Sequence, residues 1–447
     1  MTLAATGATT LARDLEAIVG AANVIEDPAA LTQYAIDGVE PRAAVTPAAA
    51  NEVAAVLKYA FDRKLTVAPA GGMSHQHIGA IPDSVDILLR TTRLKAVEHY
   101  DPGDLTIGIG AGTTIAELNA LIAPNRQVLP TEVATPEKTS VGGLIATNLH
   151  GPLKHGFGGA RDWLIGVRFV TADGKLAKAG GRVVKNVAGY DLMKLLIGSY
   201  GTLAVIVGAS FKLYPAPRGT RTYVCVFEKL QEALEFRTRI LHSPLSPLAL
   251  EIVSPHAQVA LTGDPSALPE GWRVLLRATG SDAVLARYRG ELGGALTGEI
   301  DDAGEASLWR GVAEFPLTVF SKSQNAMLVR LDLPPSEIGT ALAAAEQAAS
   351  DNNFVVATIG RVGIGALLVA FCPIAVDPPG AIQYANTISA FRGLLSGGAS
   401  AVVLRCPLEA KRHFSVWGTS PTDLDAMKAI KRAMDEHDIL NRGRFLF

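Results

Sequence analysis

The sequence is poor in cysteine. Among 447 residues, only Cys225, Cys372 and Cys406 are cysteines, and they lie far apart with no Cys-x-x-Cys pair. This spacing excludes a disulfide framework, and it excludes an iron–sulfur or zinc–thiolate site held by this chain alone. We therefore expect a protein of a reducing compartment without an iron–sulfur centre of its own.

The sequence also lacks an excess of charge of one sign and a long apolar run. Lys and Arg number 41, Asp and Glu 43, and no basic stripe is present, so nucleic-acid binding is not expected. The longest apolar run, around residues 365–376, is too short to span a bilayer. No basic segment precedes the first apolar residues, unlike in a signal peptide. We expect a cytoplasmic protein without a transmembrane segment. A mean hydropathy of +0.24 indicates a large core or surface buried against other subunits.

What the sequence does have is a loop at residues 69–79, Pro-Ala-Gly-Gly-Met-Ser-His-Gln-His-Ile-Gly. A strand-like run at 65–68 leads into it, and Gly71 and Gly72 can adopt positive φ and let a ligand approach the main chain. Successive N–H groups in such a turn form an anion-binding concavity, and no acidic residue lies between Thr66 and Pro82. Most such loops are simply tight turns, so this one indicates an anion site only together with other sites.

The hydrophobic pattern predicts an α+β chain. After a helix at 9–20, its first part contains a β-α-β unit and two hairpins, and Thr114 to Glu117 fits a capping box. A proline-rich segment at 214–218 marks a boundary. Beyond it, strands alternate with helices up to a strand at 401–405. A final helix is expected at 422–437. We predict three parts, namely residues 1–216, 217–420 and 421–447.

Three glycine-rich loops follow one another in the first part, at Gly71-Gly72, Gly110-Ala111-Gly112 and Gly142-Gly143. A Rossmann site would instead place one G-x-G-x-x-G motif after a strand, with an acidic residue downstream. The spacing here does not fit that motif. Several loops that converge on one long ligand indicate a cradle between two lobes.

These loops resemble the FAD-binding domain of the vanillyl-alcohol oxidase and p-cresol methylhydroxylase superfamily, and within it the glycolate oxidase E-subunit group. The resemblance covers residues 43–216 and 396–447. The similar stretches are 69–72, 109–118, 139–143, Asn148, 158–162, 184–192, 197–203, 415–418 and 438–445, where the family usually has proline at Arg442. The resemblance implies a two-lobed PCMH-type FAD-binding domain, residues 1–216, followed by an α+β cap domain of the substrate-binding type. The C-terminal helix and tail are then expected to return to the FAD-binding domain.

The resemblance also implies residues that bind FAD. Residues 70–74 are expected to wrap the pyrophosphate through backbone amides, and 139–143 to hold it from the second lobe at a helix N-terminus. Asn148 and Gly158 would line the adenine or flavin side, and Ile206 would contact the flavin ring through its main chain. The full expected set is Ala70, Gly71, Gly72, Met73, Ser74, Pro130, Thr139, Ser140, Gly142, Gly143, Asn148, Gly158 and Ile206.

Histidine is missing where covalent flavin would need it. Members of the superfamily with covalent flavin often have histidine directly after Gly-Gly, where Met73 stands here, so FAD is expected to be bound non-covalently. His75 and His77 are close enough to be candidates for attachment or metal binding. An H-x-H pair in a loop is, however, more often exposed or involved in packing, and we predict no metal site.

A catalytic site of the second domain is missing as well. Related 2-hydroxyacid dehydrogenases carry metal-binding histidines there, and Arg361 and Leu368 stand at the corresponding positions. Residues 396–401 contain neither Glu nor His. Without these groups we identify no metal ligand and no general base, and the catalytic residues stay unknown. Arg361 is expected to bind a carboxylate or, more often for such a residue, to form a structural ion pair.

The resemblance implies an FAD-binding subunit of a glycolate oxidase-like complex that oxidises glycolate, a small 2-hydroxy acid, to glyoxylate. Its partners would be a D-type flavoprotein subunit and an iron–sulfur subunit that passes electrons toward quinone. Whether these partners attach the chain to the inner face of the membrane is left open. Two alternatives stand beside it, a self-sufficient FAD-dependent D-lactate or 2-hydroxy acid dehydrogenase and a redox-silent assembly subunit. Lys322, Arg330 and Arg361 are the charges that would test the first of these alternatives.

Overall fold

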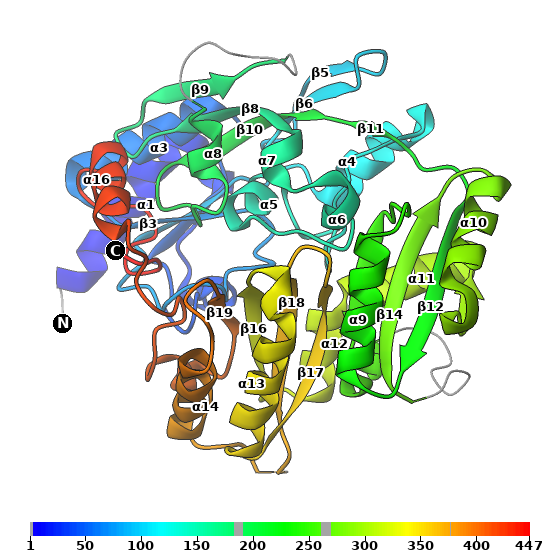
Figure 1. Cartoon of the computed structure of the whole chain (residues 1–447). Helices are drawn as coiled ribbons and strands as arrows, with labels where there is room; N and C mark the ends of the chain where they lie inside the picture. Colours follow the sequence, from blue (N-terminus) through cyan, green and yellow to red (C-terminus); the bar gives the residue numbers. More distant parts are fainter. Residues whose placement is uncertain (1–2, 183–190, 261–269, 376) are drawn as a thin grey trace.

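The computed structural model describes residues 3–182, 191–260, 270–375 and 377–447. The similar stretch at 184–192 therefore lies almost entirely outside the described residues. Figure 1 shows two sheet-containing lobes in the first half of the chain and one large sheet in the second half. Both helices and strands contribute throughout, so the α+β prediction is confirmed.

The first lobe is a four-stranded sheet in the order β1-β2-β4-β3. Helix α3 connects β2 to β3, and both strands pair in parallel with β4, which confirms the predicted β-α-β unit. Buried residues of α1, α3 and the strands form one apolar cluster. The elements are α1 (Leu3–Val19), β1 (Val24–Ile25), α2 (Pro28–Leu31), β2 (Ala43–Val45), α3 (Ala50–Arg63), β3 (Val67–Ala70) and β4 (Ile87–Arg90).

The second lobe is a five-stranded antiparallel sheet in the order β5-β6-β10-β8-β9. Both predicted hairpins, β5–β6 and β8–β9, are present. The capping box is also confirmed, because the Thr114 side chain accepts from the Glu117 amide and the Glu117 carboxylate accepts from the Thr114 amide. The elements are β5 (Val97–Asp101), β6 (Thr106–Gly110), α4 (Ile115–Ile122), β7 (Gln127–Val128), α5 (Val141–Thr147), α6 (Lys154–Phe157), α7 (Ala160–Trp163), β8 (Leu164–Val170), β9 (Leu176–Gly180), α8 (Met193–Leu196), β10 (Val205–Lys212) and β11 (Tyr214–Pro215).

The second half of the chain forms an eight-stranded antiparallel sheet in the order β15-β12-β14-β13-β17-β18-β16-β19. Alternate residues of its strands enter two apolar clusters, one shared with α9, α10, α13 and α14 and the other with α11 and α12. The elements are β12 (Thr220–Phe227), α9 (Leu230–Leu241), β13 (Ala249–Val253), β14 (Trp272–Thr279), α10 (Asp282–Leu292), β15 (Gly298–Ile300), α11 (Asp302–Ala313), α12 (Phe315–Lys322), β16 (Met327–Asp332), α13 (Ile338–Ser350), β17 (Phe354–Arg361), β18 (Ala366–Pro373), α14 (Ala381–Gly393), β19 (Ser400–Arg405) and α15 (Leu408–Lys411).

Helices α11 and α12 were not predicted from the sequence. They cover the face of the large sheet that is turned toward the two lobes, where Trp309 and Phe315 are almost completely buried. Pro316 stands near the start of α12, where the missing N–H of proline is not needed by the helix. These two helices matter for function because they form a wall of a cavity described below.

The end of the chain lies against the first lobe (Figure 1), in which α16 (Leu424–Met434) is drawn beside the N-terminal elements. The Val67 amide donates to the Ile439 carbonyl over 2.7 Å, and the Asn441 amide donates to the Val67 carbonyl over 2.9 Å. The buried Lys431 ammonium binds Asp435 at 2.6 Å and donates to the Leu440 carbonyl. Residues 439–441 thereby extend the edge of the sheet beside β3.

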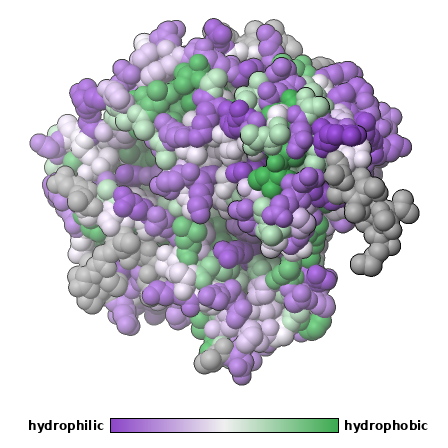
Figure 2. Space-filling view, turned by 180° about the vertical axis from the view of Figure 1, so that it is seen from behind, coloured by the Kyte–Doolittle hydropathy of each residue, from purple (hydrophilic) through white to green (hydrophobic). Residues whose placement is uncertain are grey.

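Within the described residues, no helix is long and apolar enough to cross a bilayer. On the face drawn in Figure 2, hydrophilic residues predominate and hydrophobic residues gather in separate patches.

Candidate functional site

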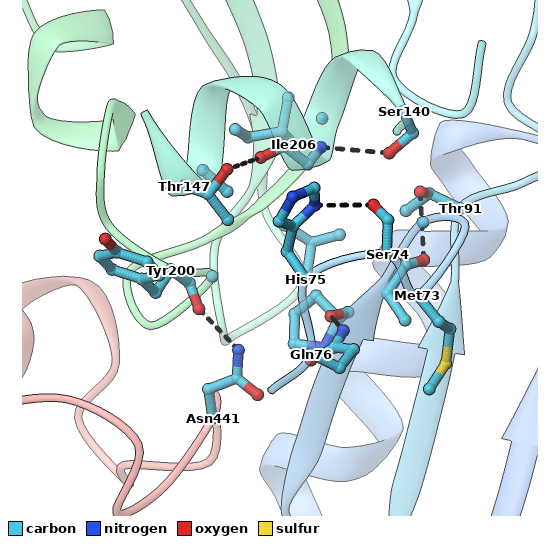
Figure 3. Close-up of a pocket in the computed structure, with 18 of the residues that line it drawn as sticks. Met73, Ser74, His75, Gln76, Thr91, Ser140, Thr147, Tyr200, Ile206 and Asn441 are labelled. Carbon is cyan, nitrogen blue, oxygen red and sulfur yellow. Dashed lines mark hydrogen bonds between the residues drawn. The ribbon is translucent and has the colours of Figure 1, made fainter. Parts of the chain in front are cut away.

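A first cavity, with about 750 Å³ of empty space, lies between the two lobes. Its walls come from the loop after β3, from α5, from the segment that enters β10 and from the C-terminal tail (Figure 3). It brings together most of the residues expected from the sequence, namely Ala70, Gly71, Gly72, Met73, Ser74, Ser140, Gly142, Gly143 and Ile206.

Four expected residues lie elsewhere. Thr139 is buried directly behind the first cavity, with its Oγ1 3.4 Å from Ser74 Oγ. Asn148 ends α5 with φ +52° and lines a second cavity. Gly158 lines a separate open hollow beside Lys154 and Asp162, and Pro130 is buried away from both main cavities. The structure therefore does not bring Gly158 and Pro130 to the expected site.

The glycine pair has a different role from the one expected. Neither Gly71 nor Gly72 has positive φ, whereas Met73 does, at +59°. A Cβ on Gly71 would lie 2.0 Å from Ser140 Oγ, and one on Gly72 would lie 2.0 Å from the Lys138 carbonyl oxygen. Positive φ at the glycines is therefore wrong as an expectation. The glycines are needed because the loop from the first lobe packs directly against the second lobe.

The backbone amides of the two loops differ in availability. At the start of α5 they are already used, because Val141 N–H donates to the Thr113 carbonyl, Gly142 N–H to the Ala111 carbonyl and Gly143 N–H to Ser140 Oγ. By contrast, no acceptor among the described residues takes the N–H groups of residues 71–74. An anion in the first cavity would thus find free donors in the loop after β3. The helix contributes its short side chains and its dipole.

Several residues of the first cavity were missed by the sequence analysis, above all Tyr200, Asn441 and Arg444. Arg444 is 4 % exposed, and its guanidinium donates to the carbonyls of Gln76 (2.7 Å) and Ile78 and pairs with Asp37 (3.3 Å). Asn441 Nδ2 donates to the Tyr200 carbonyl over 2.7 Å (Figure 3). The tail resemblance was the available signal, but it did not specify which tail residues reach the cavity.

A second cavity, with about 1000 Å³ of empty space, adjoins the first and shares Ser74, His75 and Ile78 with it. Its far wall belongs to the large sheet and its covering helices, with Val312, Pro316 and Phe320 from α11 and α12 and further residues from β16, β17, β18 and β19. Leu317 and Arg405 line it and are exposed, so the cavity has an open side.

The charges around the second cavity are mostly paired. Arg361 is buried and binds Glu251 at 3.1 Å, as the more frequent of the two sequence interpretations expected. Arg330 pairs with Asp332 at 2.9 Å. Glu132 pairs with Arg277 at 2.7 Å. Arg405 stacks over the Phe320 ring at 4.0 Å and has no carboxylate partner among the described residues. Lys322 is exposed at the end of α12 and does not line either cavity, so it is a poor candidate for substrate binding.

The H-x-H pair is not an exposed surface feature. His75 lines both cavities and His77 lines the second, with their ring centroids 6.0 Å apart. Burial lowers the pKa of His75 to about 4, and burial together with the neighbouring His75 and Arg405 lowers the pKa of His77 to about 3. Both rings are therefore neutral at physiological pH and turned toward the place where a substrate could lie.

A third histidine, His150, was overlooked in the sequence. It lines the second cavity, and its Nδ1 accepts a hydrogen bond from Arg361 over 3.2 Å. Burial and, after it, the Arg361 charge hold the pKa of His150 well below its usual range. Despite these histidines, the described residues contain no group of three or more His, Cys, Asp or Glu that could hold a metal ion.

The residues of the first cavity fit a dinucleotide with a pyrophosphate. The loop 71–74 offers free amides, no acidic side chain lines the cavity, and buried apolar residues such as Ala204 and Val205 provide a wall for a flat ring. Ile206 lines the cavity at the point where the pairing of β10 with β8 shifts register.

Comparison with known proteins agrees with this geometry. Residues 41–180 match the model of the FAD binding domain, and residues 216–389 match that of the FAD linked oxidases, C-terminal domain. The chain is 27% identical over 462 residues to a D-2-hydroxyglutarate dehydrogenase of Xanthomonas citri pv. viticola, covering 96% of this chain and 95% of that protein. It is 37% identical over 158 residues to the glycolate oxidase subunit GlcE of Escherichia coli, covering 34% of this chain and 45% of that one.

The fold is also known from solved structures. The 4-ethylphenol oxidase of Gulosibacter chungangensis superimposes with a TM-score of 0.73 at 16% identity, over 98% of this chain and 96% of that one. The predicted architecture, a PCMH-type FAD-binding domain followed by an α+β domain, is thereby confirmed. The chain is a FAD-dependent oxidoreductase that joins a FAD-binding domain to the C-terminal domain of the FAD-linked oxidases.

Proposed function

We propose that this chain itself oxidises a small 2-hydroxy acid at its own FAD. The observation that carries the proposal is the second cavity, which adjoins the proposed FAD site and shares Ser74, His75 and Ile78 with it. Bound FAD supplies the two-electron acceptor, and the protein supplies binding, orientation and proton transfer. The names of full-length relatives, among them a D-2-hydroxyglutarate dehydrogenase, support this substrate class.

The charge balance of the second cavity favours a substrate with a single carboxylate. Because Arg330, Arg361 and Glu132 each have a partner of opposite charge, Arg405 is the cation left over. A guanidinium binds a carboxylate through two parallel hydrogen bonds, so Arg405 would hold the acid group. The apolar side chains of α11 and α12 would exclude water from the reacting carbon. Glycolate and D-lactate fit this description better than a dicarboxylic acid does.

The test uses the purified full-length chain. Its FAD content is measured first, and the flavin absorbance is then followed under anaerobic conditions after addition of glycolate, D-lactate or D-2-hydroxyglutarate. We expect stoichiometric FAD and rapid bleaching with a monocarboxylate. A flavin-free protein, or flavin that none of the three acids reduces, would contradict the proposal.

A second candidate function is an electron-relaying or assembly subunit of a glycolate oxidase-like complex. Its support is the similarity to the GlcE subunit. In that case the chain should co-purify with a D-type flavoprotein and a cysteine-rich iron–sulfur protein, and substrate should reduce its flavin only in their presence. Reduction of the isolated chain would decide against a pure relay, whereas co-purification alone is compatible with both functions.

A further inference from the structure

His75 occupies a position that no other ionisable residue shares among those lining the two cavities. Of the three residues common to both, Ser74, His75 and Ile78, it is the one with an imidazole. A group at this boundary faces the substrate on one side and the flavin site on the other. In Figure 3 its ring projects from the loop after β3 into the space below α5.

A row of hydroxyl groups leads away from the His75 ring. Ser74 Oγ lies 2.7 Å from His75 Nδ1, Thr139 Oγ1 lies 3.4 Å from Ser74 Oγ, and Thr135 Oγ1 lies 3.3 Å from Thr139 Oγ1. If each group donates to the next, His75 carries its hydrogen on Nδ1 and keeps the Nε2 lone pair free. With the row in this direction, the ring is fixed and Nε2 is the acceptor.

We propose that His75 Nε2 is the general base of this chain, which replaces the base that the second domain lacks. The inference rests on the proposed function. In the reaction, the substrate O–H bond breaks and its proton passes to Nε2, while the C–H bond on the same carbon breaks and its electron pair leaves as a hydride to the bound FAD. The carbon loses two electrons and becomes a carbonyl, and the proton then leaves His75 for solvent.

The two other histidines of the second cavity are less suited to this role. Arginine has only donors, so the bond from Arg361 forces His150 Nδ1 to be the acceptor, and neutral His150 then carries its hydrogen on Nε2. His150 can therefore donate to a substrate oxygen but cannot accept its proton. His77 lines only the second cavity and makes no hydrogen bond with the hydroxyl row.

The surroundings keep His75 in the base form. Burial lowers its pKa to about 4, so the ring is unprotonated at neutral pH. The other ionisable side chains that line the two cavities are His77, Glu132, His150, Tyr200, Arg330, Arg361, Arg405 and Arg444, and the arginines among them oppose a positive charge on His75. The one acid, Glu132, is paired with Arg277. The imidazole is thus in the unprotonated form that a general base needs.

The experiment compares His75→Asn with His77→Asn in the full FAD-loaded chain. Asparagine can keep a donor near the Nδ1 position toward Ser74 but has no group at the Nε2 position. We expect H75N to bind FAD normally and to slow flavin reduction by a 2-hydroxy acid about 100-fold or more. H77N should slow it far less and should keep the acid limb of the pH–rate profile. Equal rates in wild type and H75N would overturn the inference.

A second readout does not depend on turnover. With 15N-labelled histidine, the ring correlation that disappears in H75N reports the tautomer of His75 in the wild-type chain. We expect the neutral Nδ1–H form throughout the range from pH 6 to pH 8, whereas the Nε2–H form would overturn the inference. Failure of wild-type flavin to be reduced by any 2-hydroxy acid would instead contradict the proposed function, and the two failures are thus distinguishable.

Discussion

At the scale of single residues, close packing between the lobes decides the identity of the glycines in the loop at residues 69–79, which is called the FAD loop below because it is proposed to bind FAD. The Lys138 carbonyl oxygen lies where a Cβ of residue 72 would be, and a main-chain atom cannot move aside cheaply. The sequence pattern alone suggested conformational freedom as the reason for glycine.

Gly72→Ala is therefore expected to separate the two lobes and to weaken FAD binding about tenfold or more. The measurement is a fluorescence titration of flavin-free protein with FAD, together with the melting temperature. Gly290→Ala is the matched control, because no atom lies within 4 Å of its added Cβ and the residue is inside α10. The control should leave FAD binding unchanged and stabilise the chain slightly. Unaltered FAD binding by Gly72→Ala would contradict the packing argument.

Two arginines of the second cavity should respond differently to substitution. Arg361→Gln leaves the Glu251 carboxyl buried without its partner, so we expect the free energy of unfolding to fall by about 3–5 kcal/mol. Arg405→Gln removes an exposed guanidinium without a carboxylate partner, so the fold should keep its stability.

For Arg405→Gln the expected loss is in substrate binding, with KM raised about tenfold or more and a smaller effect on kcat. Arg405→Lys keeps the charge and should lose less. Denaturant unfolding and steady-state kinetics check the two arginines side by side. A normal KM in Arg405→Gln would remove this residue from the substrate site.

At the scale of elements, the C-terminal tail completes a site that lies far from it in the sequence. Arg444 donates to the carbonyls of Gln76 and Ile78, and Asn441 donates to the carbonyl of Tyr200. Lys431 of α16 binds Asp435 and donates to the Leu440 carbonyl, which fixes the tail to this helix. The FAD loop is thus supported from behind by the last residues of the chain.

Arg444→Ala is expected to loosen the FAD loop, because the carbonyls of Gln76 and Ile78 and the Asp37 carboxylate lose a buried donor. We expect weaker FAD binding and a loss of stability of about 1–3 kcal/mol. Arg442→Ala is the control, since within the described part of the chain its side chain donates only to the Asp438 and His437 carbonyls and pairs with Asp438 in the tail. A larger effect of Arg442→Ala on FAD affinity would contradict the assigned support.

At the scale of the whole molecule, the half-buried His75 and His77 make stability depend on pH. In the unfolded chain His75 and His77 take up protons near pH 6.5, whereas in the folded chain burial delays this to about pH 4 and about pH 3. Between these values the unfolded state binds more protons, so stability falls as the pH is lowered from 6.5 toward 4. Above pH 6.5 the two residues make no difference to the pH dependence.

The variant His75→Asn/His77→Asn should therefore lose less stability than the wild type on acidification from pH 7 to pH 4. The expected difference is about 2 kcal/mol or more, measured by denaturant unfolding at each pH with the same FAD content. His256→Asn serves as a control histidine outside both cavities. Identical pH dependence in the double variant and the wild type would show that folding does not lower the pKa of these two rings.

The sequence predicted the elements well where the pattern is local. The hairpins, the capping box at Thr114 and the helix N-terminus at residues 139–143 depend on neighbours in the chain. The sequence analysis missed α11 and α12. It also did not show which charged residues of the cap domain are exposed and which are paired. Lys322, Arg330 and Arg361 are all basic, but Lys322 is exposed, Arg330 pairs with Asp332 of its own strand, and Arg361 pairs with Glu251 of a neighbouring strand.

The sequence by itself determined the class of this protein. The glycine loops, the acid-free stretch from Thr66 to Pro82 and the stretches shared with a flavoprotein family all lie in contiguous segments, where local chemistry is readable. Only the tertiary structure decided which groups meet. The contacts of Gly72 with Lys138, of His75 with two cavities and of Arg444 with the FAD loop join residues from separate parts of the chain. Such contacts depend on packing between lobes and domains, which leaves no periodic trace in the sequence.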